Sequence, residues 1–279
     1  MPHMYSLIYS ILDNNKNESF NFFIINKNIP ADDLSELSES IKFNRNSQII
    51  DCKINKKIND FLEKIPSLGW SKEIYYRLFI SDFTKSKKIL YLDCDMLVFS
   101  SLKELWNTKI DNYLFAAVED STLKDSKSKL VKASKYFNSG MLLINLQKWN
   151  QLKIKENCFK FLLNNSQFVT MPDQDALNFV SCGNWIEMDP KFNNQLNQNI
   201  LSKNVKPVIV HFNGGDKPWK YESMNLYKKN YWFYRNKTKF RRYISSNFSL
   251  KSISKKVYDF VIGKIILRIF FKLKLIING

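Results

Sequence analysis

One stretch constrains the fold more than any other: residues 87–98, KKILYLDCDMLV, where an apolar run ends in Asp93 and Asp95. The run does not alternate with polar residues, which predicts a central strand buried on both faces. Because unpaired carboxylates are costly to bury, both aspartates must lie where the strand leaves the sheet, and ligands of open α/β sheets bind at that rim. A bend there lets the two carboxylates converge on one divalent cation, while two solvated aspartates in a turn are the alternative.

Apolar periodicity predicts alternating helices and strands along the chain. The expected helices are residues 1–15, 32–41, 55–64, 70–83, 149–164 and a helix from 172, and the expected strands are 20–25, 48–54, 114–118 and 141–146. This alternation predicts an α/β fold with a mostly parallel central sheet and helices on both faces. Such a sheet rarely begins with an uncapped helix, so we expect a first strand to be missing before Met1. Residues 121–134 are polar and lysine-rich, which fits a mobile loop or flap, or a solvated surface helix.

Charge divides the chain into two parts. The 279 residues carry a net charge of +17, but residues 227–279 hold fourteen Lys or Arg against one Asp, a net +13. Residues 1–226 therefore carry only +4, as an ordinary globular domain does. We expect a domain at 1–226 followed by a basic tail at 227–279.

The tail has the pattern of a membrane-surface segment. Basic and aromatic residues interleave over 227–243, and Lys264, Arg268 and Lys272 then recur every four residues among apolar ones. Five charges between residues 257 and 277 argue against a transmembrane span, whereas a helix lying on an anionic leaflet fits. A helix packed on the domain is one alternative. Nucleic acid could also bind a basic aromatic surface, but nucleic-acid binding would not explain the two aspartates, Asp93 and Asp95, at the rim of the domain.

The cysteines indicate the compartment. Cys52, Cys94, Cys158 and Cys182 are scattered without close pairs, which excludes a zinc knuckle or a disulfide framework and suits a reducing environment. The start of the sequence lacks the basic and apolar regions of a signal peptide. We expect a cytoplasmic protein held peripherally on the inner face of the cytoplasmic membrane.

Three further polar segments interrupt apolar ones. Asn138, Ser139 and Gly140 form a small polar corner before an apolar strand, where the backbone can approach a ligand closely, or a tight turn. The triplet at residues 173–175, Asp-Gln-Asp, opens a helix and exceeds slightly what capping needs. His211 ends the apolar run 208–210, before a corner with two glycines and a lysine. It is a candidate metal ligand beside a phosphate-binding loop, or a surface histidine before a turn.

In this order and spacing, the segments resemble glycosyltransferase family 8, the retaining sugar-nucleotide transferases that include bacterial lipopolysaccharide galactosyl- and glucosyltransferases. The resemblance covers residues 1 to about 219 and rests on five segments: Tyr75-Tyr76-Arg77-Leu78, Tyr91-Leu92-Asp93-Cys94-Asp95, Phe137 to Leu146, Asp173-Gln174-Asp175, and His211 to Trp219. It implies a GT-A-type nucleotide-binding domain. The family's first strand and its Asp- and Asn-containing loop have no counterpart here, so we expect a domain truncated at its N-terminus relative to the family.

The resemblance also implies residue roles. The metal ligands are expected to be Asp93, Asp95 and His211, and a mixed carboxylate and imidazole set suits Mn²⁺, with Mg²⁺ as the alternative. The remaining donor-site residues are expected to contact the diphosphate (Arg77, Gly214, Lys217) and the transferred sugar (Asn138, Ser139, Asp173), while Asp93 also reaches the ribose. Gln174 is expected beneath the anomeric carbon, so Gln174 and Asp173 are the candidate catalytic residues.

The implied reaction is metal-dependent transfer of galactose or glucose, with retention, from a UDP-sugar to lipopolysaccharide, lipooligosaccharide or another glycan. Because an amide at Gln174 is a poor nucleophile, attack from the leaving group's own face is favoured over a covalent intermediate. Two alternatives stay open. One is a catalytically impaired, membrane-associated protein without a complete donor site, and the other is a nucleic-acid-binding protein that uses the basic tail.

Overall fold

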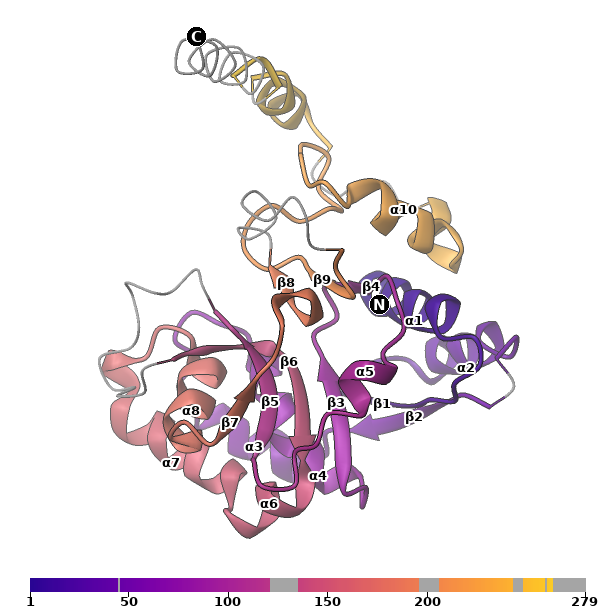
Figure 1. The fold of residues 1–279 in the computed structure, drawn as a ribbon. Coiled ribbons are helices and arrows are strands. Elements are labelled where there is room, and N and C mark those ends of the chain that lie inside the picture. The colour runs from indigo at the N-terminus through magenta and orange to yellow at the C-terminus, as the bar shows by residue number, and fades with distance from the viewer. Residues whose placement is uncertain (45, 121–134, 196–205, 243–247, 259, 263–279) are drawn as a thin grey trace, which may run out of the picture.

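The computed structural model describes the whole chain except residues 45, 121–134, 196–205, 243–247, 259 and 263–279 (Figure 1). The α-helices are α1 (Pro2–Asn14), α2 (Ala31–Ser40), α3 (Lys56–Glu63), α4 (Ile80–Phe83), α5 (Lys103–Trp106), α6 (Leu146–Gln151), α7 (Ile154–Asn165), α8 (Pro172–Ser181) and α10 (Lys228–Asn236). The 3-10 helices are η1 (Lys72–Phe79), η3 (Ser166–Phe168), η4 (Pro190–Phe192) and η5 (Lys239–Arg242). The strands are β1 (Asn21–Asn26), β2 (Gln48–Lys53), β3 (Lys88–Leu92), β4 (Met96–Val98), β5 (Phe115–Glu119), β6 (Phe137–Asn145), β7 (Trp185–Glu187), β8 (Asn194–Gln195) and β9 (Ile209–His211).

The expected alternation of helices and strands is confirmed, but the direction of the central strands was predicted wrongly. The central sheet has the order β3-β6-β5-β7, with β6 antiparallel to both neighbours and only β5 and β7 parallel. The described strands also form a parallel pair, β1-β2, and a small mixed sheet, β4-β9-β8. The sheet is mixed rather than mostly parallel. An apolar run reports burial on both faces and carries no information on strand direction.

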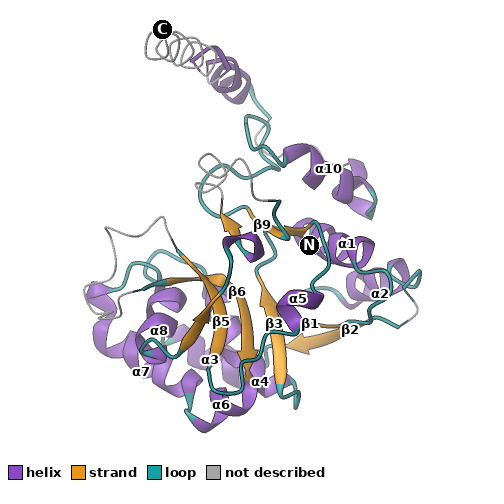
Figure 2. Ribbon diagram, viewed as in Figure 1, coloured by secondary structure: helices purple, strands orange, loops and turns teal. Residues whose placement is uncertain are grey.

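Strand β6 is the spine of the domain, because its nine residues are all buried. Phe137, Leu142 and Ile144 pack into a large cluster with the helices α3, α6, α7 and α8, which gather on one side of the sheet (Figure 2). The alternate residues Met141 and Leu143 pack into a second cluster, which includes residues of α1, α5 and β4. This alternation gives the sheet an apolar layer on each face.

Strand β3 is less buried than predicted. Its five residues are all partly exposed, and so are the apolar residues of β1. Among the described residues β1 pairs only with β2, and β3 only with β6. The two strands nonetheless contribute to the same clusters, Phe22 with Leu90 on one face and Ile25 with Ile89 on the other. One unpaired edge on each strand explains their exposure.

The first part of the predicted tail packs on the domain. Helix α10 buries Tyr231 and Tyr234 in a cluster with Leu97, Val210 and Phe212. In Figure 1 it lies next to α1, and Asn14 Nδ2 donates to the Tyr234 hydroxyl at 2.9 Å. A boundary at residue 227 therefore cuts through packed structure.

The described residues after α10 expose several apolar side chains. Residues 250–258 and 260–262 are helical, and the exposed apolar side chains there are Leu250, Val257, Tyr258, Phe260, Val261 and Ile262. Within the described part of the chain, no helix has the length and apolar character needed to cross a membrane. The rest of the predicted amphipathic helix, residues 263–279, lies outside the described residues, as does the predicted flap at 121–134.

Candidate active site

Asp93 and Asp95 lie where the chain crosses from the central sheet to the small one. Strand β3 ends at Leu92 and β4 begins at Met96. The turn between them is held at both ends: Asp93 N donates to Gly140 O at 2.8 Å and Phe212 N donates to Asp95 O at 2.9 Å. The predicted position at the strand end is thus confirmed, and the bend is a change of sheet.

The turn brings both carboxylates to His211, the last residue of β9. His211 Nε2 lies 3.3 Å from Asp95 Oδ1 and 3.9 Å from Asp93 Oδ2. One possible ligand atom from each of the three residues lies within 4.8 Å of the others. Burial alone would raise the pKa of Asp95, but the neighbouring His211 and Lys217 hold that pKa well below its ordinary range. Two carboxylates and one imidazole fit a divalent metal ion.

Gly140 makes this convergence possible. A Cβ built on Gly140 would lie 2.4 Å from His211 Cε1 and 2.9 Å from Asp93 Oδ2, closer than atoms can approach. The polar corner at 138–140 therefore does permit a close approach, although what approaches its backbone is the pair of candidate metal ligands. A side chain on β6 at this position would force His211 or Asp93 to move.

Arg77 forms ion pairs with one predicted metal ligand, Asp93, and one predicted sugar-binding residue, Asp173. Its guanidinium donates to Asp93 Oδ1 at 2.8 Å and lies 3.2 Å from Asp173 Oδ2, with a third contact to Ser139 O at 2.8 Å. Tyr91 also donates to Asp93 Oδ1, at 2.6 Å. Burial would lower the pKa of Arg77, but both carboxylates outweigh it and raise that pKa. Burial, with Asp93 nearby, raises the pKa of Asp173. Arg77 Nε is buried without a hydrogen bond among the described residues, so the guanidinium has a donor left for a ligand.

The predicted sugar-binding residues meet at the start of α8. Ser139 N donates to Gln174 Oε1 at 2.9 Å, and Ser139 Oγ donates to Asp173 Oδ2 at 3.0 Å. Asp175, the third residue of the triplet, points elsewhere. It accepts from the Tyr136 hydroxyl at 2.6 Å and from two backbone amides before the helix, so it anchors the start of α8.

Lys217 contacts a candidate metal ligand. Its ammonium donates to Asp95 Oδ2 at 2.6 Å and to Phe212 O at 2.5 Å. Gly214, the other predicted diphosphate residue, is exposed and has a φ of +77°, which only glycine adopts freely. The loop thus has one cation directed at the metal site and a backbone without a Cβ.

Two buried residues of this region were not predicted. Asp120 is 4% exposed and accepts from the side-chain amides of Asn138 and Gln174, at 3.2 and 3.1 Å. Asn193 is fully buried and bridges Asn138 and His211, at 2.9 and 3.1 Å. Asp120 directly follows β5, so the rule that selected Asp93 would also have selected it. Asn193 lies between two short segments, and no local pattern marks it.

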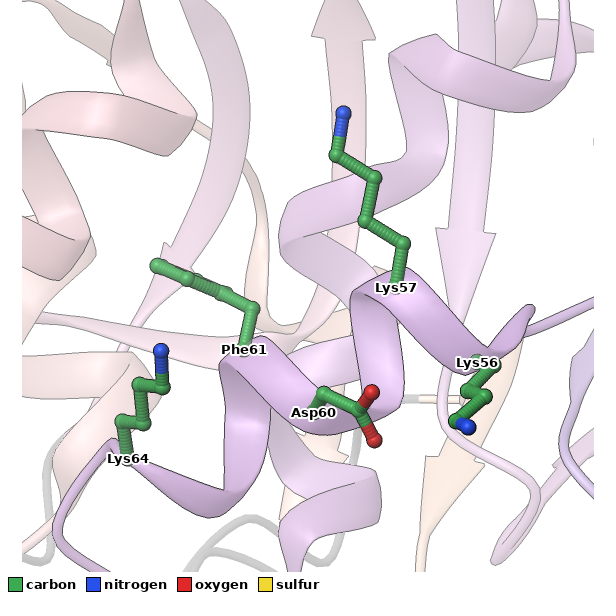
Figure 3. A pocket seen from close by; sticks show the side chains of 5 residues that line it. All are labelled: Lys56, Lys57, Asp60, Phe61 and Lys64. Carbon is green, nitrogen blue, oxygen red and sulfur yellow. The ribbon is translucent and has the colours of Figure 1, made fainter.

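A separate hollow lies on α3. It has a volume of about 580 Å³ and is lined by Lys56, Lys57, Asp60, Phe61 and Lys64 (Figure 3). It shares no residue with the site around Asp93, and no predicted residue lines it.

Comparison with known proteins agrees with this geometry. Residues 1–223 match the family model described as glycosyl transferase family 8. The chain is 29% identical over 260 residues to general stress protein A of Bacillus subtilis (strain 168), covering 85% of this chain and 90% of that protein. It is 27% identical over 228 residues to glycosyltransferase GlyF of Streptococcus pneumoniae serotype 4, covering 79% of this chain and 55% of that longer protein.

Solved structures show the same fold. The galactosyltransferase LgtC, in complex with donor and acceptor sugar analogues, superposes with a TM-score of 0.76 at 20% identity, over 91% of this chain and 95% of that one. Glycosyltransferase GlyE of Streptococcus pneumoniae TIGR4 gives a TM-score of 0.64 at 23% identity, over 84% of this chain and 57% of that one. The fold is the GT-A-like fold of glycosyltransferases. Because the family match spans most of the sequence, the chain belongs to glycosyl transferase family 8.

Proposed function

We propose that this protein is a retaining hexosyltransferase that moves galactose or glucose from a UDP-sugar to lipopolysaccharide, lipooligosaccharide or another glycan acceptor. The observation that carries the proposal is the convergence of Asp93, Asp95 and His211 beside Arg77 and Lys217. Two carboxylates, one imidazole and two cations form a site for a metal ion and a diphosphate together.

The metal that fits best is Mn²⁺, with Mg²⁺ as the alternative, because one ligand is an imidazole nitrogen. The space left by Gly140 supports the assignment, since a Cβ there would collide with two of the three ligands. When bound, the ion would supply positive charge for the departing nucleoside diphosphate. Lys217 and the Gly214 corner would bind the diphosphate oxygens, and Arg77 would contact the phosphate next to the sugar.

The sugar would lie where the start of β6 meets the start of α8. Asn138, Ser139 and Asp173 offer hydrogen bonds to its hydroxyls, and Gln174 would lie beneath its anomeric carbon. The Gln174 carbonyl oxygen already accepts from Ser139 N at 2.9 Å, which holds the amide in place and limits its use as a nucleophile. We therefore favour attack from the leaving group's own face, with the leaving phosphate oxygen accepting the acceptor's proton.

The tail would place the enzyme on a membrane from the cytoplasmic side. The helical residues 250–258 and 260–262 expose Val257, Phe260 and Val261 beside lysines, which suits the boundary between acyl chains and anionic headgroups. A glycolipid acceptor would lie in the same surface.

We also propose that the domain takes one further strand between β1 and β3. Each has an unpaired edge among the described residues, and both contribute to the same two apolar clusters. Fusing an apolar strand and an Asp/Asn loop ahead of Met1 should raise the Tm and tighten UDP binding. Unchanged values would contradict the proposal.

The reaction is tested with UDP-galactose and UDP-glucose in the presence of Mn²⁺. We expect UDP release to require the metal, and NMR to show that the transferred sugar keeps its anomeric configuration. Isothermal titration with UDP and Mn²⁺ separates binding from chemistry. A chain that binds UDP with Mn²⁺ but transfers nothing would be the impaired alternative, and a chain that binds neither would refute the site.

A further inference from the structure

An unbroken line of buried side chains joins His211 to Gln174. The contacts run from His211 Nδ1 to Asn193 Oδ1 at 3.1 Å, from Asn193 Nδ2 to Asn138 Oδ1 at 2.9 Å, and from Asn138 Nδ2 to Asp120 Oδ2 at 3.2 Å. Gln174 Nε2 donates to the same Asp120 oxygen at 3.1 Å. All five residues are at most 6% exposed.

Backbone donors fix the orientation of two amides in this line. Gly140 N donates to Asn138 Oδ1 at 3.1 Å and Ser139 N donates to Gln174 Oε1 at 2.9 Å. A backbone N–H can only donate, so each side-chain oxygen must face it. The side-chain NH₂ groups of Asn138 and Gln174 must then face Asp120, whose carboxylate oxygens accept hydrogen bonds.

The orientation of the Asn138 side chain also determines which nitrogen of His211 faces a hydrogen-bond acceptor. Asn138 Oδ1 accepts from Asn193 Nδ2, so Asn193 turns its oxygen toward His211. His211 Nδ1 must then carry a proton, which leaves Nε2 as the ring nitrogen that a metal ion can bind. Nε2 is the nitrogen directed at Asp93 and Asp95.

We propose that Asp120 is a positioning residue for both halves of the site. From one oxygen it holds the Gln174 amide and, through Asn138 and Asn193, selects the His211 tautomer that can bind a metal through Nε2. Asp120 does not contact His211 itself and acts on it through Asn138 and Asn193. That the positions of Gln174 and His211 matter for catalysis rests on the proposed function. The tautomer of His211 can be observed without any turnover.

The direct measurement is ¹⁵N NMR of the histidine rings in the Mg²⁺-loaded protein, where the metal takes the place of a proton on the ring nitrogen that it contacts. We expect the Nδ1–H tautomer at His211. An Nε2–H tautomer would overturn the proposal, whatever the enzyme does with a UDP-sugar.

Variants test the two branches separately. D120L removes the acceptor and should weaken Mn²⁺ binding to the free protein by about 10- to 100-fold, as loss of a partner behind a metal ligand usually does, and should also lower kcat. D120N keeps one acceptor oxygen and should recover most of both. N193L interrupts the branch to His211 but leaves the contact between Asp120 and Gln174 in place, so it should weaken Mn²⁺ binding more than it lowers kcat at saturating metal.

Asn145 supplies the control. It is a buried amide at the far end of β6 and bonds only to the backbone, at Lys148 N, Ile110 O and Asp111 O. N145A should lower the Tm without changing Mn²⁺ affinity. A folded D120L with wild-type Mn²⁺ affinity and kcat would refute the positioning role. If D120L does not fold, the NMR tautomer and N193L still decide it.

Discussion

Lys217 Nζ lies 2.6 Å from Asp95 Oδ2, so the lysine expected to bind the diphosphate holds a predicted metal ligand. A metal ion entering the site must share Asp95 with this cation or displace it. The two predicted roles are therefore coupled by charge repulsion, and a donor phosphate that attracts Lys217 would free Asp95 for the ion.

Lys217→Ala should consequently separate metal binding from donor binding. We expect Mn²⁺ affinity of the free protein to rise several-fold, by an amount corresponding to about 1 kcal/mol, while UDP affinity falls. Titration calorimetry with each ligand alone checks this. Lys191→Ala, which removes a surface pair with Glu104, should change neither, and weaker Mn²⁺ binding by Lys217→Ala would contradict the coupling.

Asp93→Asn and Asp95→Asn should each abolish Mn²⁺-dependent transfer but differ in stability. Asp93 neutralises the buried Arg77, so its loss should cost about 1–3 kcal/mol of unfolding free energy. Asp95 pairs with the more accessible Lys217 and should cost less. Urea denaturation beside Asp82→Asn, a surface pair with Lys155, measures the difference, and full activity in both site variants would disprove the metal site.

Gly140→Ala should abolish metal binding in a protein that still folds. The added methyl group would lie 2.4 Å from His211 Cε1, so the imidazole or β6 must move. Gly215→Ala meets no atom within 4 Å and should bind Mn²⁺ as wild type does. Manganese EPR on both variants is the measurement, and equal affinities would show that His211 is not a ligand.

His3 should make stability depend on pH. Burial, with the Met1 amino group and Arg235 adding positive charge, lowers the pKa of His3 from 6.5 to about 4. The unfolded chain therefore binds the proton more readily, so His3 contributes stability that is full above pH 6.5 and is lost as the pH falls toward 4.

The size of this contribution should be about 2–3 kcal/mol. His3→Gln should flatten the dependence of unfolding free energy on pH between 4.5 and 7. An unchanged slope would mean that His3 is not protonated on unfolding in this range.

Cutting the chain at two points tests the tail. A chain ending at residue 242 keeps α10 and should lose binding to anionic vesicles while retaining its Tm. A chain ending at 226 also loses the buried Tyr231 and Tyr234, so its Tm should fall by several degrees or more. Vesicle sedimentation and thermal unfolding give both results, and vesicle binding by the 242-residue chain would exclude the tail as anchor.

The site could be predicted from the sequence wherever polar residues end apolar runs. Asp93 and Asp95 after β3 and His211 in β9 follow that rule, because a strand that leaves a core must end in groups that tolerate water or a ligand. The same rule did not extend to Asn193, whose partners His211 and Asn138 meet it only in the folded chain.

Strand direction and the packing of α10 escaped prediction for different reasons. β6 has the same apolar pattern whether it runs parallel or antiparallel to β3, and only the connections decide. The aromatic and basic residues of α10 suggested a surface, but Tyr231 and Tyr234 pack against β9 and α1. Interleaved aromatic and basic residues do not distinguish a core-facing helix from one that faces a membrane.

The pairing of α1 with α10 has a consequence for biosynthesis. A hydrogen bond between His3 and Tyr231 and another between Asn14 and Tyr234 join residues 228 and 220 positions apart. A ribosome adding 5–20 residues each second needs roughly 10–45 s to make that distance. Throughout that time the first helix made has no α10 to cover it. We therefore expect nascent chains of this protein to depend on ribosome-associated chaperones until α10 emerges.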